Sequence, residues 1–232
     1  RCFYGSLGAC TSEVDHGQDG YDAVEWIAAQ DWCTGKVGTY GPSALGNVQY
    51  QTARYQPPHL ECCVPEVSSP IQRYDHYYPG GIARAEYIQT LGTLFGSEQA
   101  LMSFPYDSFL WDIAENETTY PEDITVPFLL IGGWFDINIE DVWHNWNLLT
   151  ASSPVADLHK IVIGPWVHGG AGPAHVGSLQ QGDLEYPEAE HYNEERALDM
   201  FDYYLRDIAN GYANDNPIEV FDLGTKNWWE GT

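Results

Sequence analysis

A serine, an aspartate and a histidine each follow a short apolar segment, at three separate places in the chain. Ser43 lies in the stretch GPSALG, Asp136 ends the stretch GGWFD, and His168 lies in GPWVHGG. A serine hydroxyl becomes nucleophilic when a histidine accepts its proton and a carboxylate holds that histidine in one tautomer. These residue types predict acyl transfer, with Ser43 as nucleophile, His168 as base and Asp136 as the acid that orients the base.

The surroundings of the serine resemble a nucleophile elbow. The apolar run KVGTY leads into a tight turn, with Gly41 two residues before Ser43 and Gly46 three residues after it. Small residues at these places let a strand and a helix approach closely around a strained serine. The spacing is G-x-S-x-x-G and not the commoner G-x-S-x-G. The motif alone therefore leaves open an ordinary strand-to-helix turn with a capping serine.

The order of the three residues strengthens this interpretation. Ser43, Asp136 and His168 occur in the chain order of the α/β-hydrolase fold. Buried strands predicted at 126–131 and 160–163 place the acid and the base at carboxyl ends of a parallel sheet, where sites form. Asp136 could instead cap the next helix. Among the other histidines, at positions 144, 159 and 175, His175 is the main rival base.

Alternating strands and helices predict an α/β fold, a mostly parallel sheet with helices on both faces. Helices are predicted at 19–31, 47–54 and 194–208, and strands at 36–40, 60–67 and 218–223. The predicted organisation is a first core part with the elbow (1–67), a helical cap insertion rich in Tyr, Pro and Gly (68–122), a second core part with the acid and the base (123–212), and the start of a C-terminal β domain (213–232).

Composition excludes several classes of partner. The chain has 34 Asp and Glu against 9 Lys and Arg, a formal net charge of −25. Such a field repels nucleic acid and anionic membranes, and no apolar run is long enough to span a bilayer. The dispersed acids favour a salt-adapted or extracellular source, and an extracellular or periplasmic location over a cytoplasmic one. The chain starts inside a predicted loop without a signal peptide, so we expect it to be a fragment.

Cysteine and histidine patterns predict neither a disulfide framework nor a metal site. The five cysteines, an odd number, include no C-x-x-C pair. The histidines show no spacing typical of metal ligands. We therefore expect no metal and no cofactor.

Several stretches resemble the CocE/NonD family of α/β-hydrolases, the cocaine esterase and X-Pro dipeptidyl-peptidase group. They are RCFYGSLG, DGYDAVEWIAAQDWCTGKVGTYGPSALG, PFLLIGGWFD, KIVIGPWVHGG and FDYYLRDIANG. The resemblance implies the same roles for Ser43, Asp136 and His168, and an oxyanion hole formed partly by the backbone N–H of Ala44. It also implies a second donor, a tyrosine upstream of residue 1, and a C-terminal jelly-roll domain. The first strands and most of that domain are expected to lie outside this chain.

Two departures from the family pattern bear on specificity. The family usually has tyrosine directly after the serine, where this chain has Ala44. The α-amino-acid ester hydrolases of the group carry carboxylates two and three residues after the triad aspartate, where this chain has Asn138 and Ile139. This argues against recognition of a substrate ammonium at those positions. Trp134 and Trp166 flank the predicted triad turns and are candidates for an apolar acyl pocket.

The predicted function is a serine hydrolase that cleaves an ester or amide through an acyl-enzyme. The expected substrate is a small-molecule ester or amide, or a short peptide. Two alternatives stay open: an exopeptidase similar to X-Pro dipeptidyl-peptidase, and a catalytically inactive hydrolase fold used for binding. A homo-oligomer is possible as well.

Overall fold

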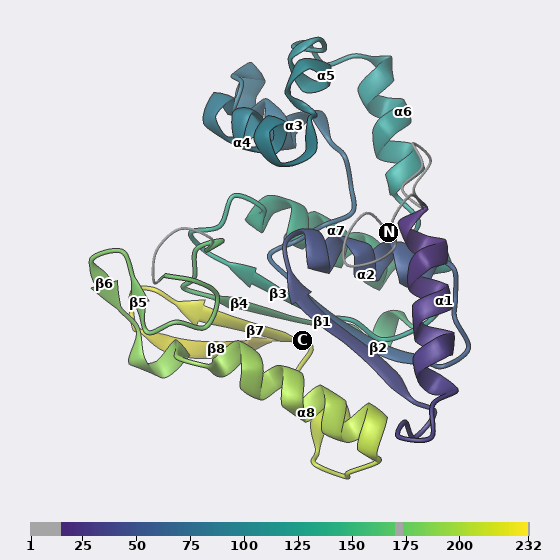
Figure 1. Ribbon diagram of the computed structural model, residues 1–232. Helices are drawn as coiled ribbons and strands as arrows, with labels where there is room; N and C mark the ends of the chain where they lie inside the picture. The colour runs from purple at the N-terminus through teal and green to yellow at the C-terminus, as the bar shows by residue number, and fades with distance from the viewer. Residues whose placement is uncertain (1–14, 170–173, 232) are drawn as a thin grey trace.

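A six-stranded sheet forms the centre of the computed structural model, which describes residues 15–169 and 174–231 (Figure 1). Its strand order is β1-β2-β3-β4-β7-β8, and all neighbours are parallel except β7 and β8. The strands are β1 (Val37–Pro42), β2 (Leu60–Glu66), β3 (Leu129–Gly133), β4 (Lys160–Gly164), β7 (Ile218–Asp222) and β8 (Asn227–Gly231). The carboxyl ends of β1 to β4 therefore lie along one edge of the sheet.

Helices cover both faces of this sheet. On one face lie α1 (His16–Ala28), α2 (Ala44–Arg54) and α7 (Ile139–Ser152), and on the other lies α8 (Tyr192–Arg206) (Figure 1). Alternate residues of the central strands face opposite sides, as strand geometry requires. Phe128 and Leu130 pack under α2 and α7, whereas Leu129 and Ile131 pack against the α8 side. β3, and β4 after its first residue Lys160, contain only apolar residues and glycine, because both faces of the sheet are buried there.

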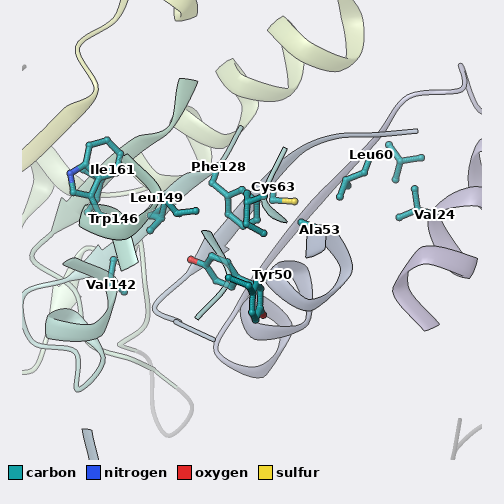
Figure 2. Close-up of a cluster of buried hydrophobic side chains, with 14 of the residues drawn as sticks. Val24, Tyr50, Ala53, Leu60, Cys63, Phe128, Val142, Trp146, Leu149 and Ile161 are labelled. Atoms are coloured by element: carbon teal, nitrogen blue, oxygen red, sulfur yellow. The ribbon is translucent and has the colours of Figure 1, made fainter. Parts of the chain in front are cut away.

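The core beneath α2 and α7 joins residues that are distant in the sequence. Figure 2 shows Tyr50 of α2 beside Phe128, with Cys63 of β2 and Leu149 of α7 in the same cluster. The rings of Tyr50 and Phe128 stack with centroids 4.8 Å apart. This packing fixes α2, and with it the turn that precedes α2, over the sheet.

A helical cap occupies the segment between β2 and β3. It consists of α3 (Tyr74–Tyr77), α4 (Ala85–Phe95), α5 (Glu98–Met102) and α6 (Phe109–Thr118), and it lies beyond the carboxyl ends of the strands (Figure 1). The cap has a small core of its own, formed by Tyr77, Tyr78, Ile88 and Trp111. The predicted parallel sheet with helices on both faces and a helical cap is thus confirmed.

The remaining elements are short. A hairpin of two-residue strands, β5 (Gln180–Gln181) and β6 (Leu184–Glu185), precedes α8. Single 3₁₀ turns occur at Pro79–Gly81, Pro121–Asp123, Ala156–Leu158, Pro187–Ala189 and Tyr212–Asn214.

The prediction that 213–232 begins a separate β domain is wrong for the described part of that segment. β7 pairs in parallel with β4, with Ile161 opposite Ile218 and Ile163 opposite Val220. β8 then returns antiparallel to β7. Ile218 and Val220 pack on the core under α7, and the fully buried Phe221 packs on the α8 side. The segment extends the main sheet, and the side chains on the two faces of β7 cover the two cores, one on each side of the sheet.

Membrane-spanning helices, metal-ligand groups and cysteine pairing can be compared with the described residues. Within 15–169 and 174–231, no helix combines the length and apolarity needed to cross a bilayer. In the same ranges, no three His, Cys, Asp or Glu side chains are grouped to hold a metal ion. Cys33, Cys62 and Cys63 are free thiols. Cys2, Cys10 and the RCFYGSLG stretch lie outside the described residues.

Candidate active site

Ser43 lies at the turn between β1 and α2 in a strained backbone conformation. Its φ is 55° and its ψ is −122°, backbone angles that residues other than glycine rarely adopt. Its N–H donates to the carbonyl of Glu66 at the end of β2 (3.0 Å), and its carbonyl accepts from Asn47 N–H (2.9 Å). The surrounding structure therefore holds the serine in place against the strain, as in a nucleophile elbow.

The two elbow glycines are required by close contacts. Gly41 has a φ of +151°, and a Cβ there would come within 2.9 Å of the Leu45 Cβ. A Cβ on Gly46 would lie 2.0 Å from the Oγ of Ser68, in the segment that follows β2. The second glycine thus stands at position 46 because that is where α2 passes Ser68, which accounts for the unusual spacing.

Asp136 follows β3 and its carboxylate is buried. One oxygen, Oδ1, accepts from the backbone N–H of Asn138 at 2.7 Å, and the other, Oδ2, faces His168. The loops after β3 and β4 are joined directly, since Trp134 N–H donates to the carbonyl of Gly164 (2.8 Å) and Phe135 N–H to that of Trp166 (3.0 Å). These bonds set the position of the acid relative to the histidine.

His168 connects the acid to the serine. Its Nδ1 lies 2.6 Å from Asp136 Oδ2, and its Nε2 lies 2.9 Å from Ser43 Oγ. An ionised carboxylate only accepts hydrogen bonds, so it assigns the proton of neutral His168 to Nδ1 and leaves Nε2 to accept from the serine. The structure therefore brings together the three residues that the sequence singled out.

The rival histidines lie elsewhere. His175 Nδ1 lies 2.7 Å from the carbonyl of Val176, and His144 Nε2 lies 3.7 Å from Glu115. His159 is buried, and its Nδ1 accepts from Phe128 N–H at 3.1 Å. Burial lowers the pKa of His159 to about 4. None of these three has a described contact with Ser43.

Ala44 is the first residue of α2. It lines the same cavity as Ser43, and within the described part of the chain its backbone N–H donates no hydrogen bond. The first N–H groups of a helix have no partner inside the helix and favour negative charge nearby. This N–H is therefore available beside the serine.

A cavity of about 390 Å³ opens next to Ser43, between the strand ends and the cap. α2 contributes Ala44, Asn47 and Gln51, and the start of α7 contributes Asn138 and Asp141. The cap side is lined by His76, Tyr77, Tyr87, Leu91, Phe95 and Leu101. Sequence reasoning missed the cap residues because that segment shows weak periodicity.

The two tryptophans predicted to line the pocket do not reach this cavity. Trp166 is fully buried and its Nε1 donates to the carbonyl of Ala189 (3.3 Å) on the α8 side of the sheet. Trp134 Nε1 donates to the carbonyl of Phe221 (2.7 Å), and the ring lines a groove with Leu223 and Trp229. Both side chains leave their loops toward β7 and β8 instead of toward the cap, so this prediction is wrong.

Comparison with known proteins identifies a family. The model of the X-Pro dipeptidyl-peptidase (S15) family matches residues 1–103 and 97–170. Cocaine esterase of Rhodococcus sp. (strain MB1 Bresler) is 24% identical over 285 residues, an alignment that covers 100% of this chain and 48% of the esterase. The chain thus spans about half the length of this curated relative.

Solved structures show the same fold. A CocE/NonD family hydrolase from Staphylococcus aureus matches with a TM-score of 0.64 and 21% identity, over 88% of this chain and 35% of the other. An aminopeptidase from a marine sediment Thaumarchaeota archaeon matches with a TM-score of 0.71 and 21% identity, over 97% and 43%. The two family-model matches together cover residues 1–170, well over half of the chain. The chain therefore belongs to the X-Pro dipeptidyl-peptidase (S15) family, a CocE/NonD-like family of hydrolases.

Proposed function

We propose that the protein is a serine hydrolase that cleaves an ester or amide bond through an acyl-enzyme. One observation carries the proposal: Ser43 Oγ, the His168 ring and the Asp136 carboxylate form a continuous chain with separations of 2.9 and 2.6 Å. A nucleophile in hydrogen-bond reach of a base, and a base oriented by a third group, is the arrangement that activates a hydroxyl.

The reaction follows from these positions. Ser43 Oγ attacks the carbonyl carbon while His168 Nε2 accepts the hydroxyl proton, and Asp136 stabilises the resulting imidazolium. Ala44 N–H donates to the oxyanion of the tetrahedral intermediate. The intermediate collapses to an acyl-Ser43 ester as Nε2 returns the proton to the leaving alcohol or amine. Water then attacks this ester while His168 Nε2 accepts its proton, and Nε2 returns that proton to Ser43 Oγ as the bond to Oγ breaks and the acid leaves. Side chains and water account for every proton in this scheme, so it requires no cofactor.

The cavity supports a small neutral ester or amide as substrate. Asp141 is the acidic residue among the described residues that line it, with one oxygen 2.6 Å from His76 Nδ1 and the other 3.7 Å from Arg73 Nη1. A carboxylate compensated in this way is a poor partner for a free amino terminus, which an X-Pro exopeptidase must bind. This contact favours esterase or acylase activity over the exopeptidase alternative.

Turnover by the full-length protein tests the proposal. With p-nitrophenyl acetate, Ser43→Ala should remove nearly all hydrolysis above the uncatalysed rate. Ser69→Ala is the matched control, because Ser69 lines the same cavity and its Oγ accepts from Ile71 N–H instead of facing a histidine. Equal activity of Ser43→Ala and the unmodified protein would contradict the proposal.

A further inference from the structure

A second histidine–carboxylate pair lies in the cavity wall and has no role in the scheme above. His76 of α3 has its Nδ1 2.6 Å from Asp141 Oδ2 in the first turn of α7. Its Nε2 lies 3.0 Å from the hydroxyl oxygen of Tyr87 in α4. His76 and Asp141 are buried and Tyr87 is partly exposed. All three line the cavity that contains Ser43.

The direction of these hydrogen bonds follows from charge. Arg73 Nη1 lies 3.7 Å from the other oxygen of Asp141. In the neutral form of His76, Nδ1–H donates to the Asp141 carboxylate, and Nε2 therefore accepts from the Tyr87 O–H. Burial and the nearby carboxylates of Asp141 and Asp136 raise the pKa of Tyr87 to about 12, so the hydroxyl keeps its proton at neutral pH.

Tyr87 therefore has its proton directed to His76 and its oxygen lone pairs left for the cavity. We propose that Tyr87 is a substrate-binding residue whose oxygen accepts a hydrogen bond from an N–H or O–H group beside the scissile carbonyl. His76 and Asp141 are positioning residues that fix this orientation. The inference rests on the proposed serine hydrolase function and narrows its substrates to esters or amides that carry such a donor.

Hydrogen bonds connect the helix of Tyr87 to the loop of Asp136, and that loop to the segment after β2. Arg84, just before α4, donates from Nη1 to the carbonyl of Ile137 at 3.0 Å, next to Asp136 in sequence. Asn138 in the same loop donates from Nδ2 to the carbonyl of Val67 at 2.7 Å, close to the elbow. A hydroxyl held at a fixed place relative to the nucleophile can orient a substrate at low entropic cost. Leu91 and Phe95 of the same helix supply apolar surface for the rest of the substrate.

A pair of matched substrates tests the inference on the full-length protein. The p-nitrophenyl ester of N-acetylalanine has an N–H beside the scissile carbonyl, and that of O-acetyllactic acid has an ester oxygen there. We expect kcat/KM, measured by nitrophenol release, to favour the N–H ester by about three- to tenfold, the range for one neutral hydrogen bond. Tyr87→Phe should abolish this preference through a loss on the N–H ester alone. His76→Asn should weaken the preference, because it releases the tyrosine hydroxyl.

Tyr74→Phe is the matched control, since Tyr74 is also a cap tyrosine but its hydroxyl donates to the carbonyl of Pro105 (3.0 Å) outside the cavity. It should leave the preference unchanged. Turnover of the O-acetyllactic ester reports whether each variant is folded. No preference in the unmodified protein, or an equal loss on both esters in Tyr87→Phe, would overturn the inference. Absence of any Ser43-dependent turnover would instead overturn the proposed function on which it rests.

Discussion

At the scale of residues, His168 is held by two contacts with different consequences. In the proposed reaction, Asp136 fixes the tautomer of His168, and Nε2 of His168 receives the Ser43 proton during attack. His175, seven residues further along, has its Nδ1 against a backbone carbonyl of its own loop. His168 is therefore placed to act on Ser43, whereas the Nδ1 contact of His175 stays within its own loop.

We expect His168→Ala to lower kcat by about 10³-fold or more, because no other described histidine contacts Ser43. His175→Ala should change kcat little. The measurement is steady-state turnover of p-nitrophenyl acetate by the two full-length variants. The reverse ranking would show that the base has been assigned to the wrong loop.

The lowered pKa of buried His159 makes the stability of the folded protein depend on pH. Its folded-state pKa of about 4 lies below the ordinary value of 6.5, because the buried ring is favoured in the neutral form. The stability that this residue contributes is therefore present above pH 6.5 and is lost as the pH falls toward 4. A shift of this size corresponds to about 3 kcal/mol in the free energy of unfolding.

Urea denaturation of the full-length protein between pH 7 and 4.5 tests this dependence. His159→Asn should lose less stability over this range than the unmodified protein, because the residue that must take up a proton is gone. The matched control is His191→Asn, since His191 is exposed and pairs with Glu194 at 3.2 Å. Identical pH profiles for His159→Asn and the unmodified protein would contradict this prediction.

The triad could be predicted from sequence because each member lies in the turn or loop after a recognisable strand, and parallel strand ends meet at one edge. Tyr87 and His76 could not, because their roles depend on Asp141, which lies 65 residues beyond His76. Trp134 and Trp166 were misplaced for a related reason. Their positions near the triad were correct, but the direction of each side chain is set by the loop bonds that join β3 and β4.

At the scale of elements, the elbow depends on how closely α2 passes the segment after β2. The gap between Gly46 and Ser68 has no room for a methyl group. Ser68 is buried and, within the described residues, its Oγ has no hydrogen-bond partner. The Ser68 side chain therefore fills the space beside α2 and makes no hydrogen bond among the described residues.

Gly46→Ala should destabilise the protein by about 1–3 kcal/mol, because overpacking at Ser68 outweighs the gain of up to about 1 kcal/mol in helix propensity. Ser68→Gly in the same molecule removes both close atoms and should restore much of the loss. The measurement is the free energy of unfolding of the single and double variants. A single variant as stable as the unmodified protein would mean that the elbow has more room than the structure shows.

Element types were predictable from local pattern, but the sheet membership of the last hairpin was not. Ile218 to Asp222 has the alternation of a strand, and nothing local shows that its partner is β4. That pairing is decided by the two cores, which need apolar cover on both sides of β7.

At the scale of the whole molecule, negative charge greatly exceeds positive charge. With 34 acids and 9 Lys and Arg, most carboxylates cannot have a Lys or Arg of their own. The few cations are shared: Arg196 alone lies 2.8 Å from each of Asp199, Asp215 and Glu219. Unpaired surface carboxylates repel one another, and the compact state suffers more than the unfolded one.

We expect the melting temperature of the full-length protein, if the whole chain shares this acidity, to rise between 0.01 M and 1 M sodium chloride. Over this range the screening length falls from about 30 Å to about 3 Å. A variant that neutralises the exposed Asp31, Asp183 and Glu185, which lie outside helix first turns, should melt higher at low salt and respond less to added salt. A flat or falling melting temperature in thermal scans at fixed neutral pH would show that charge repulsion does not limit stability.

An activated serine forms a covalent adduct with a fluorophosphonate, and the position of that adduct identifies the nucleophile. The full-length protein is treated with a fluorophosphonate, digested, and analysed by peptide mass spectrometry. We predict one modification, on Ser43, which is absent from Ser43→Ala and greatly slowed in His168→Ala. A modification on a different serine, or undiminished labelling of Ser43→Ala, would contradict the assignment of Ser43, His168 and Asp136 as the catalytic residues.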